Sequence, residues 1–138
     1  MRPRHGRVLL IAAVVAVAAC AQQEEPPALE QQPNDLTPTL TRVQELEQKA
    51  RAIARADGCD RLDQCATAPV GAKACGGPRT HLIYCKATTN EDELFRVLDE
   101  LKRTEEAYNR TEGVMSDCRF VEPPSVQLAG RSCVAATL

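Results

Sequence analysis

Two stretches of the chain repeat an apolar residue every three or four positions, which is the spacing of one helix face. The first stretch predicts a helix in which Thr37 is the N-cap and Pro38 takes the first turn, where a missing N–H is tolerated. Gly58 is the expected C-terminal stop. The apolar positions of this helix are Leu40, Val43, Leu46, Ala50, Ile53 and Ala54.

The second stretch predicts a helix that begins at residues 88–90 and ends at Gly113. Residues 88–90 are Thr-Thr-Asn and offer N-cap side chains. Three acids follow at residues 91–93, where the positive end of the helix dipole favours negative charge. The apolar positions of this helix are Leu94, Val97, Leu98, Leu101 and Tyr108, with Phe95 beside them.

Short apolar runs outside the helices predict β-strands at residues 64–68, 80–87, 118–121, 126–128 and 132–136. Glycine and proline break the chain between these runs. The order of elements predicts an α+β fold class, with two amphipathic helices packed on a small antiparallel sheet. We expect this disulfide-stapled domain to occupy residues 39–138.

The first 19 residues follow a different pattern, in which three arginines precede the apolar run Val8–Ala19. Twelve apolar residues are too few for a bilayer-spanning helix, which needs about 20, so residues 1–19 are predicted to be a signal peptide. The run ends in Val17-Ala18-Ala19-Cys20, which resembles the lipobox of bacterial lipoproteins. The resemblance implies cleavage before Cys20, palmitate-type acylation of its thiol and anchorage in a lipid membrane. An ordinary cleaved signal with a chance cysteine is the alternative.

Residues 20–38 are rich in Gln, Glu and Pro and show no apolar period, so they are predicted to be a flexible linker behind the lipidated Cys20. Such a linker reaches on the order of 25 Å. By resemblance to lipoprotein sorting rules, Ala21 after the cysteine implies the outer membrane, with the domain facing the periplasm. After residue 19 the chain has 14 basic and 19 acidic side chains, a net charge of −5, so no nucleic-acid partner is expected.

Six cysteines remain after Cys20, an even number that predicts three disulfides in an exported domain of this size. Fifteen pairings are possible, and locality alone favours Cys59–Cys65. A zinc site is the weaker alternative, because no C-x2-C pair is present and the mature chain has a single histidine. We expect neither a metal nor another cofactor. The disulfide cysteines are Cys59, Cys65, Cys75, Cys85, Cys118 and Cys133.

One local sequence is distinctive: GAKACGGPR at residues 71–79, followed by Tyr84 and later by SDC at residues 116–118. It resembles a family of small bacterial exported proteins with a GAKPCGGP-type signature and a late SDC, over roughly residue 59 to the C-terminus. That family commonly has a small polar residue where this chain has Cys85, and a cysteine near Leu128, so no disulfide pattern is carried over. The family has no established activity, so the resemblance supports the domain and not a mechanism.

Candidates for catalysis are few. His81 is the only histidine after the signal peptide, and its place in an apolar strand favours a structural role. No nucleophile elbow, phosphate loop or C-x-x-C motif is present. The acids Asp99, Glu100, Glu105 and Glu106 are predicted to be solvated on a helix face. We therefore expect a protein that is not an enzyme.

Two functions fit this sequence. The first is a membrane-anchored interaction or structural module of the cell envelope, with an envelope protein as its partner. The alternative is a protease inhibitor, in which a Cys75–Cys85 disulfide braces a basic loop. In the plainer interpretation, Gly76 and Gly77 merely shape a tight crossing beside a disulfide. The candidate binding loop consists of Lys73, Gly76, Gly77, Pro78 and Arg79.

Overall fold

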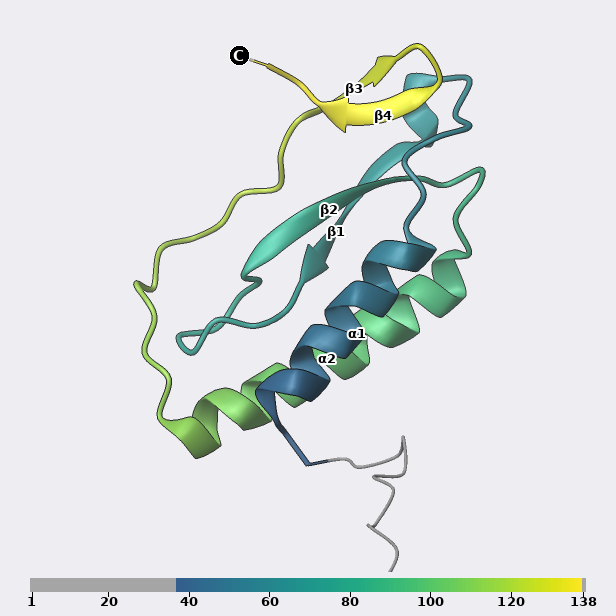
Figure 1. Cartoon of the computed structure of the whole chain (residues 1–138). Coiled ribbons are helices and arrows are strands. Elements are labelled where there is room, and N and C mark those ends of the chain that lie inside the picture. Colours follow the sequence, from purple (N-terminus) through teal and green to yellow (C-terminus); the bar gives the residue numbers. More distant parts are fainter. Residues whose placement is uncertain (1–36, 138) are drawn as a thin grey trace, which may run out of the picture. The chain divides into compact units, whose positions relative to one another are not determined.

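A computed structural model describes residues 37–137 (Figure 1). The predicted signal peptide, Cys20 and all of the linker before Thr37 lie outside the described residues. Two helices and small antiparallel sheets confirm the α+β prediction. In chain order the elements are α1 (Leu40–Ile53), the 3-10 turn η1 (Leu62–Gln64), β1 (Cys65–Val70), β2 (Thr80–Cys85), α2 (Glu91–Glu112), β3 (Val126–Ala129) and β4 (Ser132–Ala135).

Both ends of α1 differ from the sequence prediction. The N-cap is Thr39, whose Oγ1 accepts a hydrogen bond from the N–H of Arg42 at 3.1 Å, so Thr37 and Pro38 precede the helix. The helix ends at Ile53, five residues before Gly58. A tertiary contact explains this early end, since the N–H of Arg55 donates to Thr89 Oγ1 at 3.0 Å. Long-range contacts of this kind leave no local signal in the sequence.

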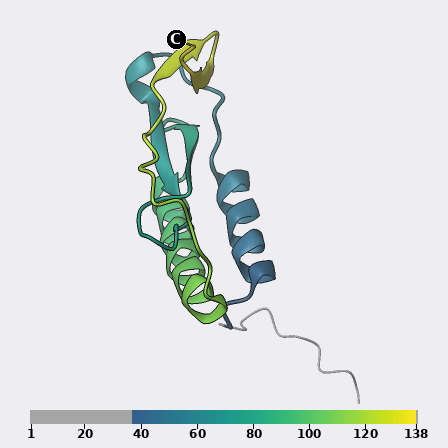
Figure 2. The ribbon, with the colours of Figure 1, turned by 90° about the vertical axis from the view of Figure 1, so that its left-hand side faces the viewer.

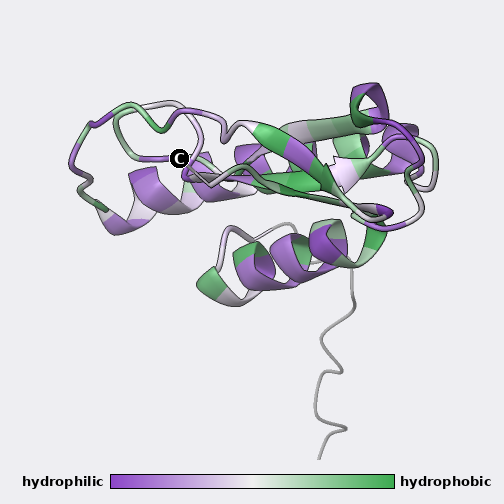
Figure 3. Ribbon diagram, turned by 90° about the horizontal axis from the view of Figure 1, so that it is seen from above, coloured by the Kyte–Doolittle hydropathy of each residue, from purple (hydrophilic) through white to green (hydrophobic). Residues whose placement is uncertain are grey.

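Helix α2 has the predicted ends. Asn90 is the N-cap and its Oδ1 accepts from the N–H of Glu93, while Gly113 closes the helix in the left-handed conformation with φ of 62°. The helices and the β1–β2 hairpin enclose one apolar core, and the outer faces of both helices are hydrophilic (Figure 3). The core residues are Val43, Leu46, Ala50, Ala68, Val70, Leu82, Tyr84, Leu94, Val97, Leu98 and Leu101.

The strands form two small sheets instead of one. Strands β1 and β2 pair antiparallel, from Cys65 opposite Cys85 to Val70 opposite Thr80, and β3 pairs with β4 in the same sense. Residues 114–125, which we call the strap, connect α2 to β3 without a strand. The strand predicted at residues 118–121 is therefore wrong. Cys118, at a φ of +53°, cannot continue an extended strand.

The two helices run antiparallel, because the segment after α1 contacts the segment before α2 through Arg55 and Thr89. The start of α1 and the end of α2 therefore lie at one end of the domain, and the β3–β4 hairpin lies at the other (Figures 1 and 2). The strap runs between these two ends, past the loop that joins β1 to β2.

All six cysteines after Cys20 are paired, which confirms three disulfides. The bonds are Cys59–Cys85, Cys65–Cys133 and Cys75–Cys118. The predicted Cys59–Cys65 pairing is wrong, because Cys65 and Cys85 face each other across the hairpin and each bonds to a cysteine outside it. Those two disulfides form a second buried cluster, which ties the hairpin to β4 and to the segment after α1.

Candidate functional site

The loop between β1 and β2 (residues 71–79, the β1–β2 loop) contains the distinctive GAKACGGPR sequence. Its tip is a tight turn in which the N–H of Gly76 donates to the carbonyl of Lys73 at 2.9 Å. The N–H of Lys73 in turn donates to the carbonyl of Gly77 at 3.0 Å. Gly76 and Gly77 have φ values of 96° and 76°, a region that side chains disfavour. The tip is exposed from Ala74 to Gly77.

A buried carboxylate of α2 holds the base of this loop. Glu105 Oε2 accepts from the N–H of Ala72 at 2.8 Å, and Oε1 accepts from Nε of Arg79 at 2.8 Å. Gly71 lies so close that a Cβ there would stand 2.2 Å from Glu105 Oε2. Asn109 adds a hydrogen bond from Nδ2 to the carbonyl of Ala72 at 2.9 Å. Both the N–H and the carbonyl of Ala72 are therefore hydrogen-bonded to side chains of α2, which fixes the backbone at residues 71–72.

The prediction that Glu105 is solvated is wrong, since its side chain is 9% exposed. The sequence does contain a signal for this burial. Glu105 stands four residues after Leu101 and three before Tyr108, which is the next position of the apolar stripe of α2. An acid at such a position faces the interior and needs hydrogen-bond partners there.

Arg79 was a candidate for contacting a partner, but both ends of its guanidinium are occupied. Besides Glu105, it contacts Glu47 of α1 at 2.5 Å, so it links the loop to both helices. Burial lowers the pKa of Arg79, but its hydrogen bonds to Glu47 and Glu105 outweigh this and raise it. Burial likewise raises the pKa of the Glu47 carboxyl, and hydrogen bonds from Arg79 and Arg51 outweigh this and lower it.

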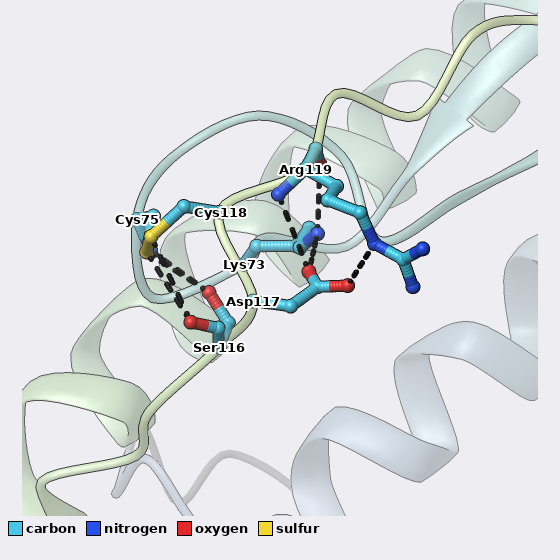
Figure 4. Close-up of polar contacts among 6 residues, drawn as sticks. All are labelled: Lys73, Cys75, Ser116, Asp117, Cys118 and Arg119. Atoms are coloured by element: carbon cyan, nitrogen blue, oxygen red, sulfur yellow. Dashed lines mark hydrogen bonds and ion pairs between the residues drawn. A yellow bond between two sulfur atoms is a disulfide. The ribbon is translucent and has the colours of Figure 1, made fainter.

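The strap clamps the other side of the loop (Figure 4). Cys75 is bonded to Cys118, and the N–H of Cys75 donates to Ser116 Oγ at 3.3 Å. The Lys73 ammonium forms an ion pair with Asp117 and donates to the carbonyl of Arg119 at 2.8 Å. Hydrogen bonds from Lys73 and then Arg119 hold the pKa of Asp117 well below its ordinary value.

The GAKACGGPR and SDC sequences thus form one structural unit, although about 40 residues separate them. The plainer interpretation of the glycines, a tight crossing beside a disulfide, agrees with these contacts. The Cys75–Cys85 pairing behind the protease-inhibitor alternative is wrong, because Cys75 bonds to Cys118 and Cys85 to Cys59. The loop that such an inhibitor needs is not closed in that way.

A hollow of about 320 Å³ lies between the loop and the end of α2. Two charged side chains at its wall, Glu106 and Arg110, have no hydrogen-bond or ion-pair partner among residues 37–137. Sequence reasoning did not single them out, because charges on a helix face are ordinary. The residues that line the hollow are Lys73, Ala74, Gly76, Glu106, Asn109, Arg110 and Val114.

Three features of the described residues bear on catalysis or metal binding. His81 lies on β2 opposite Pro69, and its buried Nδ1 has no partner within the described residues. Tyr84 donates to Glu91 at 2.7 Å, and burial together with that carboxylate raises the pKa of Tyr84 to about 12. Sulfurs of Cys59, Cys65 and Cys133 lie within 4.8 Å of one another, but as disulfides they lack the thiolate that zinc requires.

Comparison with protein-family models, with curated proteins and with solved structures finds no match for this chain. Its function has to be inferred from its own geometry. Within residues 37–137, neither helix is long and apolar enough to cross a membrane.

Proposed function

We propose that this chain is a cell-envelope lipoprotein, held in a membrane by an acylated Cys20, whose folded domain is an interaction or structural module. The arithmetic of the cysteines supports the anchor. Six of the seven cysteines bond to one another, so Cys20 is the one left over for lipid. Three disulfides also suit an oxidising compartment outside the cytoplasm.

The observation that carries the module is the bracing of the β1–β2 loop. A disulfide, a buried carboxylate and two ion-paired cations fix a short loop whose exposed tip has almost no side chains. A surface fixed before binding loses little conformational entropy when a partner docks. The bracing therefore suits a protein that presents a rigid surface to its partner. In this proposal Lys73 and Arg79 hold the loop in place and do not contact the partner.

The hollow beside the loop supplies the polar part of the proposed interface. Glu106 and Arg110 have no side-chain partner within residues 37–137 and stand four residues apart on α2, next to the exposed residues Ala74 and Gly76. Unpaired charges of both signs favour an envelope protein with complementary charges over a polyanion such as nucleic acid.

The anchor is tested by labelling growing cells with an alkyne analogue of palmitate. Wild-type protein should carry the label and sediment with membranes, whereas the Cys20→Ser variant should lose both properties. Labelling of the variant, or membrane binding without it, would contradict acylation at Cys20.

The interface is tested by crosslinking in cells followed by mass spectrometry. The Glu106→Ala/Arg110→Ala variant removes the two unpaired charges that line the hollow, without changing the net charge. Its matched control is Asp99→Ala/Arg103→Ala, which removes an exposed ion pair of the same spacing from the same helix. We expect one envelope protein to be captured by wild type and control and to be lost from the hollow variant. Equal capture by all three would contradict this interface.

A further inference from the structure

The disulfides of the domain differ in their exposure to solvent. The cysteines of the second buried cluster, which form two of the bonds, are each at most 9% exposed. Cys75 and Cys118, which form the third, are both exposed. A disulfide is cleaved by a thiolate that has to reach one of its sulfurs, so access decides which bond reacts first. A thiol in solution therefore reaches the Cys75–Cys118 bond before the other two.

This bond is also the main fastening between the strap and the rest of the domain. Within residues 37–137, all polar contacts from residues 116–119 to other segments go to Lys73 and Cys75 (Figure 4). The ion pair among these contacts joins Lys73 to Asp117, whose side chain is 48% exposed. An ion pair open to solvent contributes far less than a covalent bond. Cleavage of the disulfide therefore leaves the middle of the strap weakly held.

The backbone at Cys118 favours such a release. In the part of the chain that the structure describes, Cys118 is the one residue other than glycine with a positive φ, which is +53°. This conformation costs free energy for a residue with a Cβ, and it persists only where the surroundings impose it. The bond to Cys75 constrains the side chain of Cys118. Once that bond is open, residue 118 is free to return to an extended conformation.

One sulfur of the bond has a hydrogen-bond donor beside it. The Ser116 hydroxyl donates to Cys75 Sγ at 3.2 Å, and the Cys75 N–H donates to Ser116 Oγ at 3.3 Å, which holds the hydroxyl in place. A hydrogen bond to sulfur stabilises the negative charge of a thiolate. Since a stabilised thiolate leaves faster, Cys75 Sγ is the better leaving group when the bond is attacked.

We propose that Cys75–Cys118 is a thiol–disulfide exchange site, which a protein dithiol opens to release the strap. One thiolate of the dithiol attacks Cys118 Sγ and forms a mixed disulfide, while the electron pair of the broken S–S bond goes to Cys75 Sγ, which takes up a proton. The second thiol of the dithiol loses its proton and displaces Cys118 Sγ, which is protonated in turn. Two electrons and two protons thus pass to Cys75 and Cys118, and the dithiol becomes a disulfide.

Release of the strap loosens one wall of the hollow. That wall includes Ala74 and Gly76, the two neighbours of Cys75. The base of the loop stays fixed to α2, because the hydrogen bond from the Ala72 N–H to Glu105 does not involve the strap. Partner binding at the hollow then depends on the state of the disulfide. This last consequence rests on the proposed function, whereas the exchange site itself does not.

Reduction by dithiothreitol tests the selectivity of the site. Full-length protein is exposed to dithiothreitol under native conditions, alkylated with N-ethylmaleimide at successive times and mapped by mass spectrometry, which assigns each thiol separately from Cys20. We expect Cys75 and Cys118 to be alkylated about tenfold faster than the cysteines of the buried cluster, because a buried sulfur reacts only after local opening. Equal rates at all six positions would overturn the site.

Substitution of Ser116 tests which sulfur leaves. Ser116→Ala should slow the reduction several-fold, because Cys75 then leaves without its hydrogen bond. Ser116→Thr retains a hydroxyl and should keep the wild-type rate. The same rate is expected for Ser125→Ala, which removes an exposed hydroxyl elsewhere on the strap. An undiminished rate in Ser116→Ala would overturn the exchange step as written.

Hydrogen exchange before and after reduction tests the release of the strap. The Cys75 N–H donates to the strap and the Ala72 N–H donates to α2, so the two amides are matched reporters. Reduction should speed exchange at Cys75 several-fold more than at Ala72. An equal change at the two amides, or none, would overturn the release. These measurements need no partner, so a chain that is reduced selectively but captures no envelope protein would contradict the proposed function alone.

Discussion

The core and the β1–β2 loop are held in different ways. Between the helices and the hairpin, eleven buried residues pack against one another, and all of them except Tyr84 have wholly apolar side chains. The loop and the strap instead bury little apolar surface and are joined by the Cys75–Cys118 disulfide, the Lys73–Asp117 pair and the buried Glu105.

The core and the loop contacts therefore have different effects: the core stabilises the whole domain, and the loop contacts fix the local backbone conformation. Apolar burial is non-directional and tolerates changes that conserve volume, so the core stabilises the whole domain. Disulfides and charged hydrogen bonds are directional, and each one fixes a particular part of the backbone. A substitution in the core should therefore weaken the whole fold, and one in the loop should alter local shape first.

Truncating the core should have the largest effect. Leu101 is fully buried on α2, and Leu101→Ala should lower the free energy of unfolding by about 2–5 kcal/mol through lost burial and a cavity. Urea unfolding followed by circular dichroism measures this, with Leu101→Met as the volume-conserving control, expected to cost less than about 1.5 kcal/mol. Similar losses for the two variants would contradict an apolar, close-packed core at this position.

Removing the strap disulfide comes next. Cys75→Ser/Cys118→Ser should lower the free energy of unfolding by about 2–4 kcal/mol, because a closed loop with a sequence separation of 43 is released in the unfolded chain. Hydrogen exchange should speed up in the β1–β2 loop and the strap while α1 stays protected. Equal loss of protection in α1 would mean that the loop is not a separate local unit.

Substituting the glycine at the base of the loop should lower the free energy of unfolding by less than removing the disulfide does. It should still lower it by more than substituting a glycine elsewhere. Gly71→Ala both strains a φ of +70° and pushes into Glu105, whereas Gly130→Ala strains a φ of +61° with nothing within 4 Å. The control should lose about 1–2 kcal/mol from backbone strain. Gly71→Ala should lose a further amount of about 0.5–1.5 kcal/mol, because the added methyl group disturbs the hydrogen bond from Ala72 to the buried Glu105 carboxylate. Equal thermal shifts would contradict the carboxylate anchor.

Lowering the pH should have the smallest effect on the stability of the domain. Asp117 and Glu47 have pKa values lowered by folding from ordinary values of 3.8 and 4.5, so they stabilise the fold above that range. The stabilisation is lost as the pH falls through their folded pKa values. The melting temperature of wild type should therefore drop more steeply below about pH 4.5 than that of Glu47→Gln/Asp117→Asn. Parallel curves for the two proteins would contradict these lowered pKa values.

Much of the core could be predicted from the sequence, because the residues that specify a helix lie close to one another along the chain. The apolar period of α2, its cap at Asn90 and its stop at Gly113 all act within a few residues of one another. The end of α1 could not be predicted, since Thr89 decides it from 34 residues away. The two-sheet arrangement likewise depends on which segments meet in space.

The loop could be recognised as distinctive but not explained. Its cysteine, Cys75, pairs with a residue 43 positions away, and no local feature of the sequence indicates that pairing. Lys73 and Arg79 looked like binding residues because their partners, Asp117 and Glu105, lie on other segments. Only the position of Glu105 on the apolar stripe pointed to the structural role of these charges.

The most direct test of the account is the intact mass of the protein extracted from membranes, followed by non-reducing peptide mapping. We expect a chain that begins at an acylated Cys20 and lacks the six hydrogens removed by three disulfides. Its linked peptides should be Cys59–Cys85, Cys65–Cys133 and Cys75–Cys118. A chain without an acyl group at Cys20, or with Cys20 itself in a disulfide, would contradict the tethered, disulfide-braced module proposed here.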